Sequence, residues 1–423
     1  MLKQIILSSV LVFILASSSH ADGPLRDAIG ARTTGRGGVN IGFSDNGQMI
    51  IDNPAAIVNM SSLRLRDFGF DLLMTDLDYS DPDNPNAPAQ DNPVPLGHFS
   101  MARKSANSNL GFGLGVFSQG GTSAEYEMNG PAPFLGRQNY KSFGGLIRVL
   151  PAISYRVNNR LSIGGNLGVA VKHMELEGPY FLQGPSPFAG TPTRIDLQAT
   201  GAALSWATGI QYLLTPATTI GLNYQSETRF SLNGNAVIAV PGLGSSRFDS
   251  TFDMALPQSL GFGLKHVLNP RTRVGLDLIW YDWSRAYDSF DITLQDPDNP
   301  VFAAVLGNQL EEQFPLRWRD TVSVKLGAER DLANGRVVRA GYVYHRNPIP
   351  EDTLTPFLQT TLEHAFSVGY GWKSIFGDID LAYQFSYSGE KSVGTSAFIG
   401  GDFDNATHRT QAHWLSISCI KRF

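Results

Sequence analysis

The chain has 423 residues, a formal net charge of −5, a charged fraction of 17%, 44 glycines and one cysteine. The slight negative charge gives no electrostatic footprint for nucleic acid, and the single Cys419 excludes an internal disulfide. Charged residues make up about a quarter of an ordinary soluble domain, and this chain also has few amphipathic helical stretches, so a soluble helical enzyme is not expected.

The first residues have the three parts of a secretory signal peptide. Lys3 provides a positive charge, residues 5–16 form an apolar stretch, and residues 19–21 (Ser-His-Ala) offer a small-x-small cleavage site. A transmembrane helix needs about 20 apolar residues, and this stretch is shorter. We therefore expect residues 1–21 to be a cleaved signal peptide.

The following segment, residues 22–62, lacks the alternation of a membrane strand. It is rich in small and polar residues, and its run from Gly35 to Gly38 is not followed by the Gly-Lys-Ser/Thr of a phosphate-binding loop. Near its end, Asn53 can cap a short helix in which Pro54 takes the first position. We expect a helical turn there, before the first strand.

Alternation of apolar and polar side chains with a period of two predicts β-strands over the rest of the chain. Between residues 379 and 388, large apolar residues alternate with small or polar ones. Such a small and polar face suits the lumen of a transmembrane barrel. The register predicts that Trp372, Tyr383 and Phe385 face lipid and that Lys373, Gln384 and Ser386 face the lumen.

Short and long connections alternate strictly along the chain. Tight turns are expected near residues 106–108, 158–159, 215–216, 269–270, 334–335 and 376–377. Long connections are expected at residues 81–95, 120–139, 178–194, 235–250, 291–316, 347–361 and 391–407. Outer-membrane barrels have short periplasmic turns and long external loops. The chain is therefore predicted to be all-β, with an antiparallel transmembrane barrel of about 14 strands over residues 63–423.

A secreted β-rich adhesin would not need this strict alternation of connections. In a β-sandwich the polar face meets water, whereas here it consists mostly of Gly, Ser, Ala and Asn, which suits a barrel lumen. A barrel of that size is wider than the roughly eight-stranded barrels whose side chains fill the interior. Something other than wall residues must therefore occupy or gate its lumen.

Several short motifs, in this order and spacing, resemble one known family. The first is Asn53-Pro54-Ala55, after a segment rich in small residues. The others are Pro257-Gln258-Ser259-Leu260-Gly261, Leu276-Asp277-Leu278 with Trp280 and Trp283-Ser284, Trp318-Arg319-Asp320 with Leu326-Gly327, Arg339-Ala340-Gly341-Tyr342, and Asn347-Pro348-Ile349-Pro350. Together they resemble the FadL/TodX family of outer-membrane transporters for long-chain fatty acids and aromatic hydrocarbons.

The resemblance implies a fourteen-stranded barrel in which residues 22–62 fold inside the lumen as a hatch, with Asn53, Pro54 and Ala55 at the gate. It also implies that apolar cargo is captured at outer loops and crosses passively, without ATP. Fatty acids, alkanes and aromatic compounds all stay open as cargo. The expected partners are hydrophobic small molecules, outer-membrane lipid and lipopolysaccharide, and the barrel-assembly machinery, but no nucleic acid.

Apolar residues on two of the expected loops are candidates for cargo capture. The third long loop offers Tyr180, Phe181, Leu182 and Phe188, and the fourth offers Val237, Ile238, Val240 and Leu243. Exposed apolar patches often mark binding surfaces, but the same residues could pack on each other as a lid. The resemblance favours capture, because it implies that these two loops form the groove that cargo enters.

Strand parity predicts that Arg317, Arg319, Lys325, Arg339 and His345 face the lumen. Of these, Arg319, Lys325 and Arg339 are candidates to anchor a fatty-acid carboxylate by charge-assisted hydrogen bonds. The alternative is that they pair with Asp277, Asp380 or acidic residues of the N-terminal segment. For each cation taken singly, this pairing is favoured over the binding of cargo.

The remaining motifs give little support for other chemistry. Asp-Pro-Asp-Asn-Pro occurs at 81–85 and 296–300, where calcium could bind but solvated turns explain the residues more simply. No Gly-x-Ser-x-Gly or His-Glu-x-x-His motif is present, so no cofactor, metal or catalytic residue is predicted. The rival functions are a general diffusion porin for polar solutes and, less favoured, an outer-membrane lipid-modifying enzyme.

Overall fold

A computed structural model describes residues 25–423, except residues 91 and 185. The predicted signal peptide, residues 1–21, lies outside the described residues. Within the part that is described, no helix is both long enough and apolar enough to cross a membrane.

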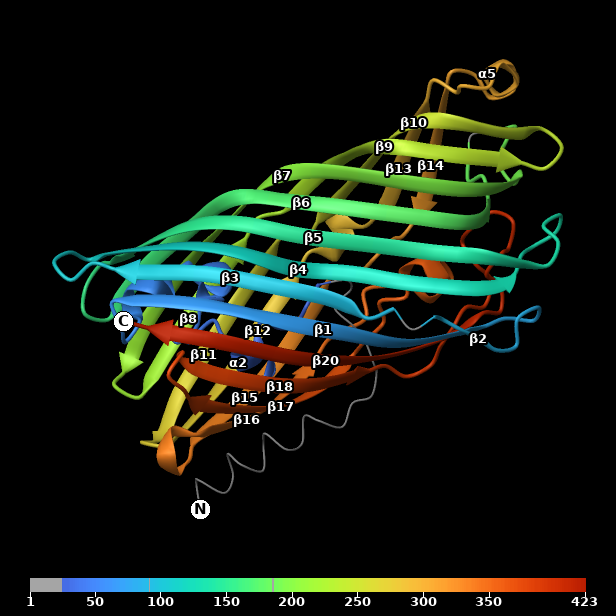
Figure 1. Cartoon of the computed structure of the whole chain (residues 1–423). Helices are drawn as coiled ribbons and strands as arrows, with labels where there is room; N and C mark the ends of the chain where they lie inside the picture. The colour runs from blue at the N-terminus through green and yellow to red at the C-terminus, as the bar shows by residue number, and fades with distance from the viewer. Residues whose placement is uncertain (1–24, 91, 185) are drawn as a thin grey trace.

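One antiparallel sheet contains all the strands (Figure 1). The strands are β1 (Arg64–Ser80), β2 (Ala87–Pro88), β3 (Val94–Lys104), β4 (Leu110–Asn129), β5 (Arg137–Arg156), β6 (Leu161–Phe181), β7 (Pro192–Thr215), β8 (Thr218–Gln225), β9 (Thr228–Val240), β10 (Gly244–Leu256), β11 (Ser259–Asn269), β12 (Thr272–Tyr281), β13 (Ser289–Gln295), β14 (Gln309–Pro315), β15 (Thr321–Asp331), β16 (Val337–Tyr344), β17 (His364–Lys373), β18 (Asp378–Tyr387), β19 (Lys391–Ser392) and β20 (Thr407–Arg422). The helical turns are α2 (Ala31–Thr34), α3 (Met49–Asp52), η2 (Pro54–Asn59), α4 (Trp283–Ala286), α5 (Pro300–Leu306), η3 (Ala333–Gly335), η4 (Glu351–Thr353) and η5 (Pro356–Leu358).

The sheet closes into a barrel of fourteen strands, as the alternation of connections predicted. Its first and last long strands, β1 and β20, pair from Leu65 with Arg422 to Ser80 with Thr407. Four of the fourteen are interrupted, so that β8 with β9, β10 with β11, β12 with β13, and β14 with β15 each form one wall strand. Because the count is even, both ends of the barrel lie at the same rim.

The interruptions divide the wall into two levels. Below them, β12 pairs with β15 and β15 pairs with β16. Above them, β10 pairs with β13 and β13 with β14, while among the described residues β14 forms a ladder with β13 alone. The strands β9, β10, β13 and β14, with α5 beyond them, therefore project past the rest of the rim (Figure 1).

All six tight turns lie where the sequence predicted them, and they share one end of the barrel. The long connections lie at the other end, but four are shorter than expected. The predicted ranges 120–139, 178–194, 235–250 and 291–316 shrink to 130–136, 182–191, 241–243 and 296–308. The prediction was wrong there because Gly- and Pro-containing stretches continue the ladders, as in β6 with β7 up to Phe181 and Pro192.

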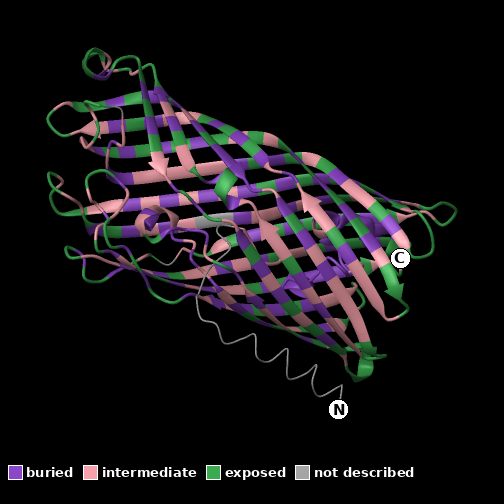
Figure 2. Cartoon of the chain, turned by 180° about the vertical axis from the view of Figure 1, so that it is seen from behind, coloured by how far each residue is buried: buried purple, intermediate pink, exposed green. Residues whose placement is uncertain are grey.

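The predicted register of the last strands is confirmed. In β18, Gln384 and Ser386 are buried toward the lumen, while Tyr383 is exposed on the outside. Figure 2 shows the resulting alternation of buried and exposed bands along the strands. Lys373 departs from the expectation, because it is the last residue of β17 and is exposed at the short-turn rim.

Two packed regions fill the interior. Near the short-turn end lies the N-terminal segment (residues 25–62), which is almost wholly buried from Ile29 to Phe43 and carries α2, α3 and η2. Near the long-connection end, a larger apolar cluster gathers inward side chains of the wall and of the connections. The space between and within these two regions positions the candidate site.

Candidate functional site

A cavity, here called the outer cavity, lies inside the apolar cluster near the long-connection end. The aromatic residues lining it are Phe143, Tyr180, Phe181, Phe252, Phe290, Phe314, Phe357, Phe398 and Phe403. Adjacent rings touch edge to face or tilted, with centroids 5.0 Å apart for Phe252 and Phe290 and 6.1 Å apart for Phe314 and Phe398. Such a lining can solvate an apolar molecule but offers little to a polar one.

The outer cavity has a volume of about 80 Å³. That is roughly half of the ~150 Å³ of an apolar cavity that holds benzene. A molecule of that size or larger therefore requires some of the lining rings to move apart.

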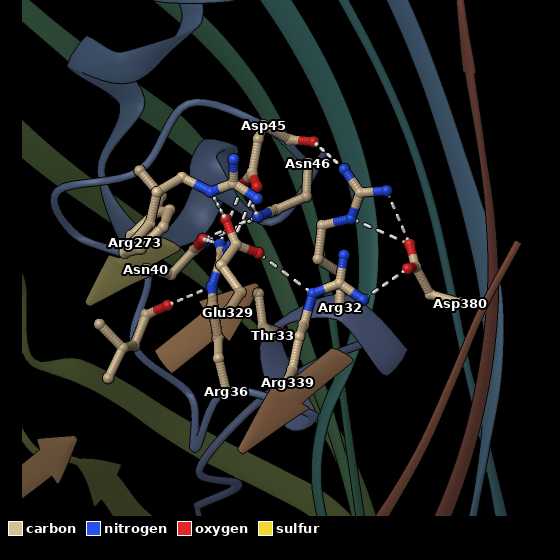
Figure 3. Close-up of polar contacts among 12 residues, drawn as sticks. Arg32, Thr33, Arg36, Asn40, Asp45, Asn46, Arg273, Glu329, Arg339 and Asp380 are labelled. Atoms are coloured by element: carbon tan, nitrogen blue, oxygen red, sulfur yellow. Dashed lines mark hydrogen bonds and ion pairs between the residues drawn. The ribbon is translucent and has the colours of Figure 1, made fainter. Parts of the chain in front are cut away.

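A network of ion pairs, here called the ion network, joins the N-terminal segment to the wall near the short-turn end (Figure 3). Asp380 on β18 accepts hydrogen bonds from Arg32 Nε at 2.9 Å and from Arg339 Nη1 at 2.7 Å. Arg36 is held by both oxygens of Asp45, at 2.9 Å each, and lies 3.6 Å from Glu329 on β15. Apart from Asp45, whose side chain is 29% exposed, these charges are almost wholly buried, and buried ions are tolerated only when each finds partners.

Backbone amides of the N-terminal segment also bind inward side chains of the wall. Asp277 on β12 accepts from the amides of Asn40 and Ile41 at 2.7 and 3.0 Å. Gly37 donates to the Ser367 hydroxyl at 3.0 Å. The segment therefore satisfies its irregular backbone against the polar lumen wall, as a buried loop must.

The motif Asn53-Pro54-Ala55 fixes the end of the segment to the wall. Asn53 Oδ1 accepts from the amide of Ala55 at 3.2 Å, and Pro54 begins η2, so the predicted cap is present. The side-chain nitrogen Nδ2 of Asn53 donates to the backbone oxygens of Ile41 and Ile210 at 2.9 and 3.0 Å. One side chain thus ties η2 to both the segment and β7.

The family model for outer membrane protein transport proteins (OMPP1/FadL/TodX) matches residues 12–423. The chain belongs to the FadL/TodX family. Its members are non-enzymatic outer-membrane channels for hydrophobic compounds, so the short-turn end of this FadL/TodX barrel is periplasmic and the long-connection end faces outward.

Solved structures with the same fold agree with this membership. A FadL homologue from Pseudomonas aeruginosa superimposes with a TM-score of 0.77 at 16% identity, covering 95% of this chain and 100% of its own. The toluene transporter TodX of Pseudomonas putida superimposes with a TM-score of 0.77 at 18% identity, covering 94% of this chain and 99% of its own. The toluene transporter TbuX of Ralstonia pickettii superimposes with a TM-score of 0.71 at 18% identity, with the same coverage of both chains. No curated protein matches in the sequence search.

The capture residues predicted for this FadL/TodX barrel do not form an exposed loop surface. Tyr180 and Phe181 end β6 and line the outer cavity. Leu182 is fully buried, and Phe188 packs against the apolar cluster. For Tyr180 and Phe181 the reason is that β6 and β7 stay paired past the expected loop boundary, up to Phe181 and Pro192.

The fourth predicted loop is instead the hairpin of β9 and β10. Val240 is the last residue of β9, Leu243 lies in the turn, and both are partly buried against the apolar cluster. Ile238 is fully buried, whereas Val237 is exposed. Neither Val240 nor Leu243 lines the outer cavity.

Most of the cavity lining was missed by sequence reasoning. Phe252, Phe290 and Phe314 come from three different strands, and Phe357, Phe398 and Phe403 come from two long connections. The only usable signal was the number of phenylalanines in the predicted external regions, because no spacing along the chain brings these residues together.

The predicted lumen cations have three different fates. Arg339 and Lys325 are buried and face the lumen, but Arg339 binds Asp380 and Glu329, and Lys325 donates to the backbone oxygen of Asp27 at 2.7 Å. The pairing with Asp380 is the alternative stated from the sequence. Arg319 was misplaced, because residues 316–320 lie between β14 and β15 and the strand parity fails there; its side chain is exposed.

Arg317 is likewise exposed and pairs with Asp352 at 2.6 Å, whereas His345 does face inward, 2.7 Å from Asp27. In the repeated Asp-Pro-Asp-Asn-Pro turns, Asp81 accepts from the amides of Asp83 and Asn84, and Asp298 accepts from that of Arg247. These hydrogen bonds fit the solvated-turn interpretation.

Gly341→Val is expected to displace the N-terminal segment and make the barrel leak ions. A Cβ atom at Gly341 on β16 would overlap the backbone of Arg36 and Gly37, and only glycine permits this approach. Gly97→Val is the matched control, since its Cβ would meet only one backbone oxygen at 3.9 Å. Conductance in planar bilayers measures the leak, and equal conductance of both variants would contradict the expected close packing.

Proposed function

We propose that this FadL/TodX protein carries small hydrophobic compounds passively across the outer membrane, with the outer cavity as binding site and the N-terminal segment as a hatch. The observation that carries the proposal is the aromatic lining of the outer cavity on the external side of a lumen whose periplasmic half is packed with polypeptide. Phe181 and Tyr180, singled out from the sequence, belong to that lining.

A second cavity supports a route from the outer cavity toward the hatch. This inner cavity shares Ser142 and Phe357 with the outer one and extends to Leu25 and Arg26. Arg26 there forms a buried ion pair with Asp71 at 2.8 Å. The guanidinium also lies over the ring of Trp414, 4.9 Å from its centroid. In this proposal, the first residues of the N-terminal segment must shift before cargo passes further.

The rival porin function is less well supported. A diffusion porin for polar solutes needs a water-filled lumen, whereas in this barrel buried hydrogen bonds and ion pairs hold residues 25–60 against the wall. The structurally similar proteins described as toluene transporters or monoaromatic hydrocarbon channels make aromatic compounds natural candidates for cargo. Contacts with lipopolysaccharide and with the assembly machinery stay predictions.

The test is uptake by a strain that lacks the protein, with and without the gene restored. We expect the restored strain to accumulate labelled aromatic hydrocarbon, alkane or fatty acid faster, while uptake of a small labelled sugar stays the same. Cell-surface abundance, measured by antibody against the outer connections, is the control. Faster sugar uptake with no gain for any hydrophobic compound would favour the porin.

A further inference from the structure

The charges around the outer cavity all have one sign. Among the described residues that line it, Asp402 is the only one with an ionisable acidic or basic side chain besides tyrosine, and there is no lysine, arginine or histidine. The lumen cations Arg32, Arg36 and Arg339 lie at the periplasmic side, where they are bound to carboxylates in the ion network. A carboxylate brought into this cavity would therefore meet no cation among the described lining residues; the buried Lys172 lies two residues before the lining residue Met174 on β6 but does not itself line the cavity.

Asp402 offers an unused hydrogen-bond acceptor at the cavity. It lies in the connection between β19 and β20, directly before the lining residue Phe403. Its Oδ1 atom is buried and has no hydrogen-bond partner among the described residues. Burial and the charge of Asp81 raise the pKa of Asp402 to about 7. A buried acceptor without a partner is unfavourable, so a donor that reaches it would be bound strongly.

A second acidic group stands behind the same lining. Glu312 on β14 accepts from the amide of Gln183 at 2.7 Å, and Gln183 lines the cavity. The other carboxyl oxygen of Glu312, Oε1, is buried and has no partner in the part of the chain that is described. One acidic side chain, Asp402 of the connection before β20, thus lines the apolar cavity, and a second, Glu312 of β14, lies behind its lining residue Gln183.

We infer that the outer cavity selects hydrophobic compounds whose polar end donates a hydrogen bond, a hydroxyl or an amine, and that Asp402 receives that donor. This inference rests on the proposed function, because it names the class of cargo for the same cavity. A carboxylate is rejected for two reasons: it would lose its hydration without gaining a cation, and it would face like charge. A plain hydrocarbon fits the rings but leaves Asp402 without a partner.

The experiment measures binding of four compounds with one carbon skeleton to the purified protein in detergent. The compounds are phenylpropanol, phenylpropylamine, phenylpropanoate and propylbenzene. We expect the alcohol and the amine to bind about tenfold more tightly than the hydrocarbon, as one hydrogen bond to a charged or buried acceptor allows, and the carboxylate to bind least.

Three variants assign the effect to Asp402. Asp402→Ala should abolish the preference, so that the alcohol and the amine bind no more tightly than propylbenzene binds to the same variant. Asp402→Asn keeps a hydrogen-bond acceptor but no charge. Compared with Asp402→Ala, it should therefore restore binding of the alcohol more than binding of the amine. Asp83→Ala, at an exposed acidic residue outside the cavity, is the matched control. Migration of unheated samples on gels verifies that every variant is a folded barrel.

The outcomes separate this inference from the proposed function. If phenylpropanoate binds as tightly as phenylpropanol, or if Asp402→Ala changes no ratio among the compounds, the inference is wrong although the cavity still binds cargo. If none of the four compounds binds, the outer cavity is not a cargo site, and the proposed function itself fails there. If Asp402→Asn weakens binding of phenylpropylamine alone, the cargo is assigned to ammonium compounds. If Asp402→Ala weakens binding of both phenylpropanol and phenylpropylamine, the result supports hydrogen-bond donors in general.

Discussion

Deletion of residues 25–50 is expected to convert the closed barrel into an open pore that conducts small ions continuously. The deletion removes α2, the first two residues of α3, and both arginines through which the ion network reaches the N-terminal segment, Arg32 and Arg36. The wall itself should persist, because its ladders, including the closing pair of β1 and β20, do not depend on that segment. Arg339 still neutralises Asp380 and Glu329 after the deletion.

Single-channel recordings in planar bilayers measure this effect, and circular dichroism confirms the β content of each protein. Deletion of residues 300–306, which form the external helix α5, is a control that shortens the chain at the outer end and leaves the N-terminal segment and the ion network in place. If the intact protein already conducts like an open porin and the N-terminal deletion adds nothing, the hatch hypothesis is wrong and the porin takes its place.

The substitution Phe181→Asp is expected to lower uptake of hydrophobic compounds at least about tenfold while leaving assembly intact. Phe181 lines the outer cavity at the end of β6, and its ring lies against Gly400. A carboxylate there must be desolvated whenever apolar cargo enters, which is costly because the lining offers no cation. Folding tolerates the charge better, since the side chain is only partly buried near the outer rim.

Leu135→Asp is the matched control for this prediction. Leu135 also lies at the outer end, but 91% of it is exposed and it lies outside both cavities. Initial rates of labelled-compound uptake, normalised to surface abundance, provide the comparison. Equal rates in the two variants would remove Phe181 from the route of the cargo.

The barrel was predictable because lipid and lumen impose opposite demands on alternate residues. In β18 this demand places Tyr383 outside and Gln384 inside, and the sequence shows it directly. Tight turns were equally visible, since each needs a short polar or Gly- and Pro-containing pair between two apolar runs. Register then follows, because a slip by one residue would invert both faces.

The outer half was less predictable, because neither lipid nor a regular period constrains it. Toward the outer end, the ladder of β6 and β7 continues through residues that usually mark loops, and Tyr180 within it is buried rather than exposed. The interruption at residues 316–320 breaks the parity on which the placement of Arg319 depended. The outer cavity is assembled from distant segments, and a single sequence carries no signal of such contacts.

The two levels of the wall also differ in stiffness. Around the periplasmic half the hydrogen-bonded ring is complete, so widening it would break ladder bonds. Above the interruptions, β14 forms a ladder only with β13 among the described residues, so the wall of the outer half has a gap in its hydrogen bonding along one side of β14. Across that gap the ring of Phe314 on β14 contacts the ring of Phe398, with centroids 6.1 Å apart. The outer half can therefore widen around bound cargo by exchanging contacts between rings for contacts between rings and cargo, while every hydrogen bond of the wall stays in place.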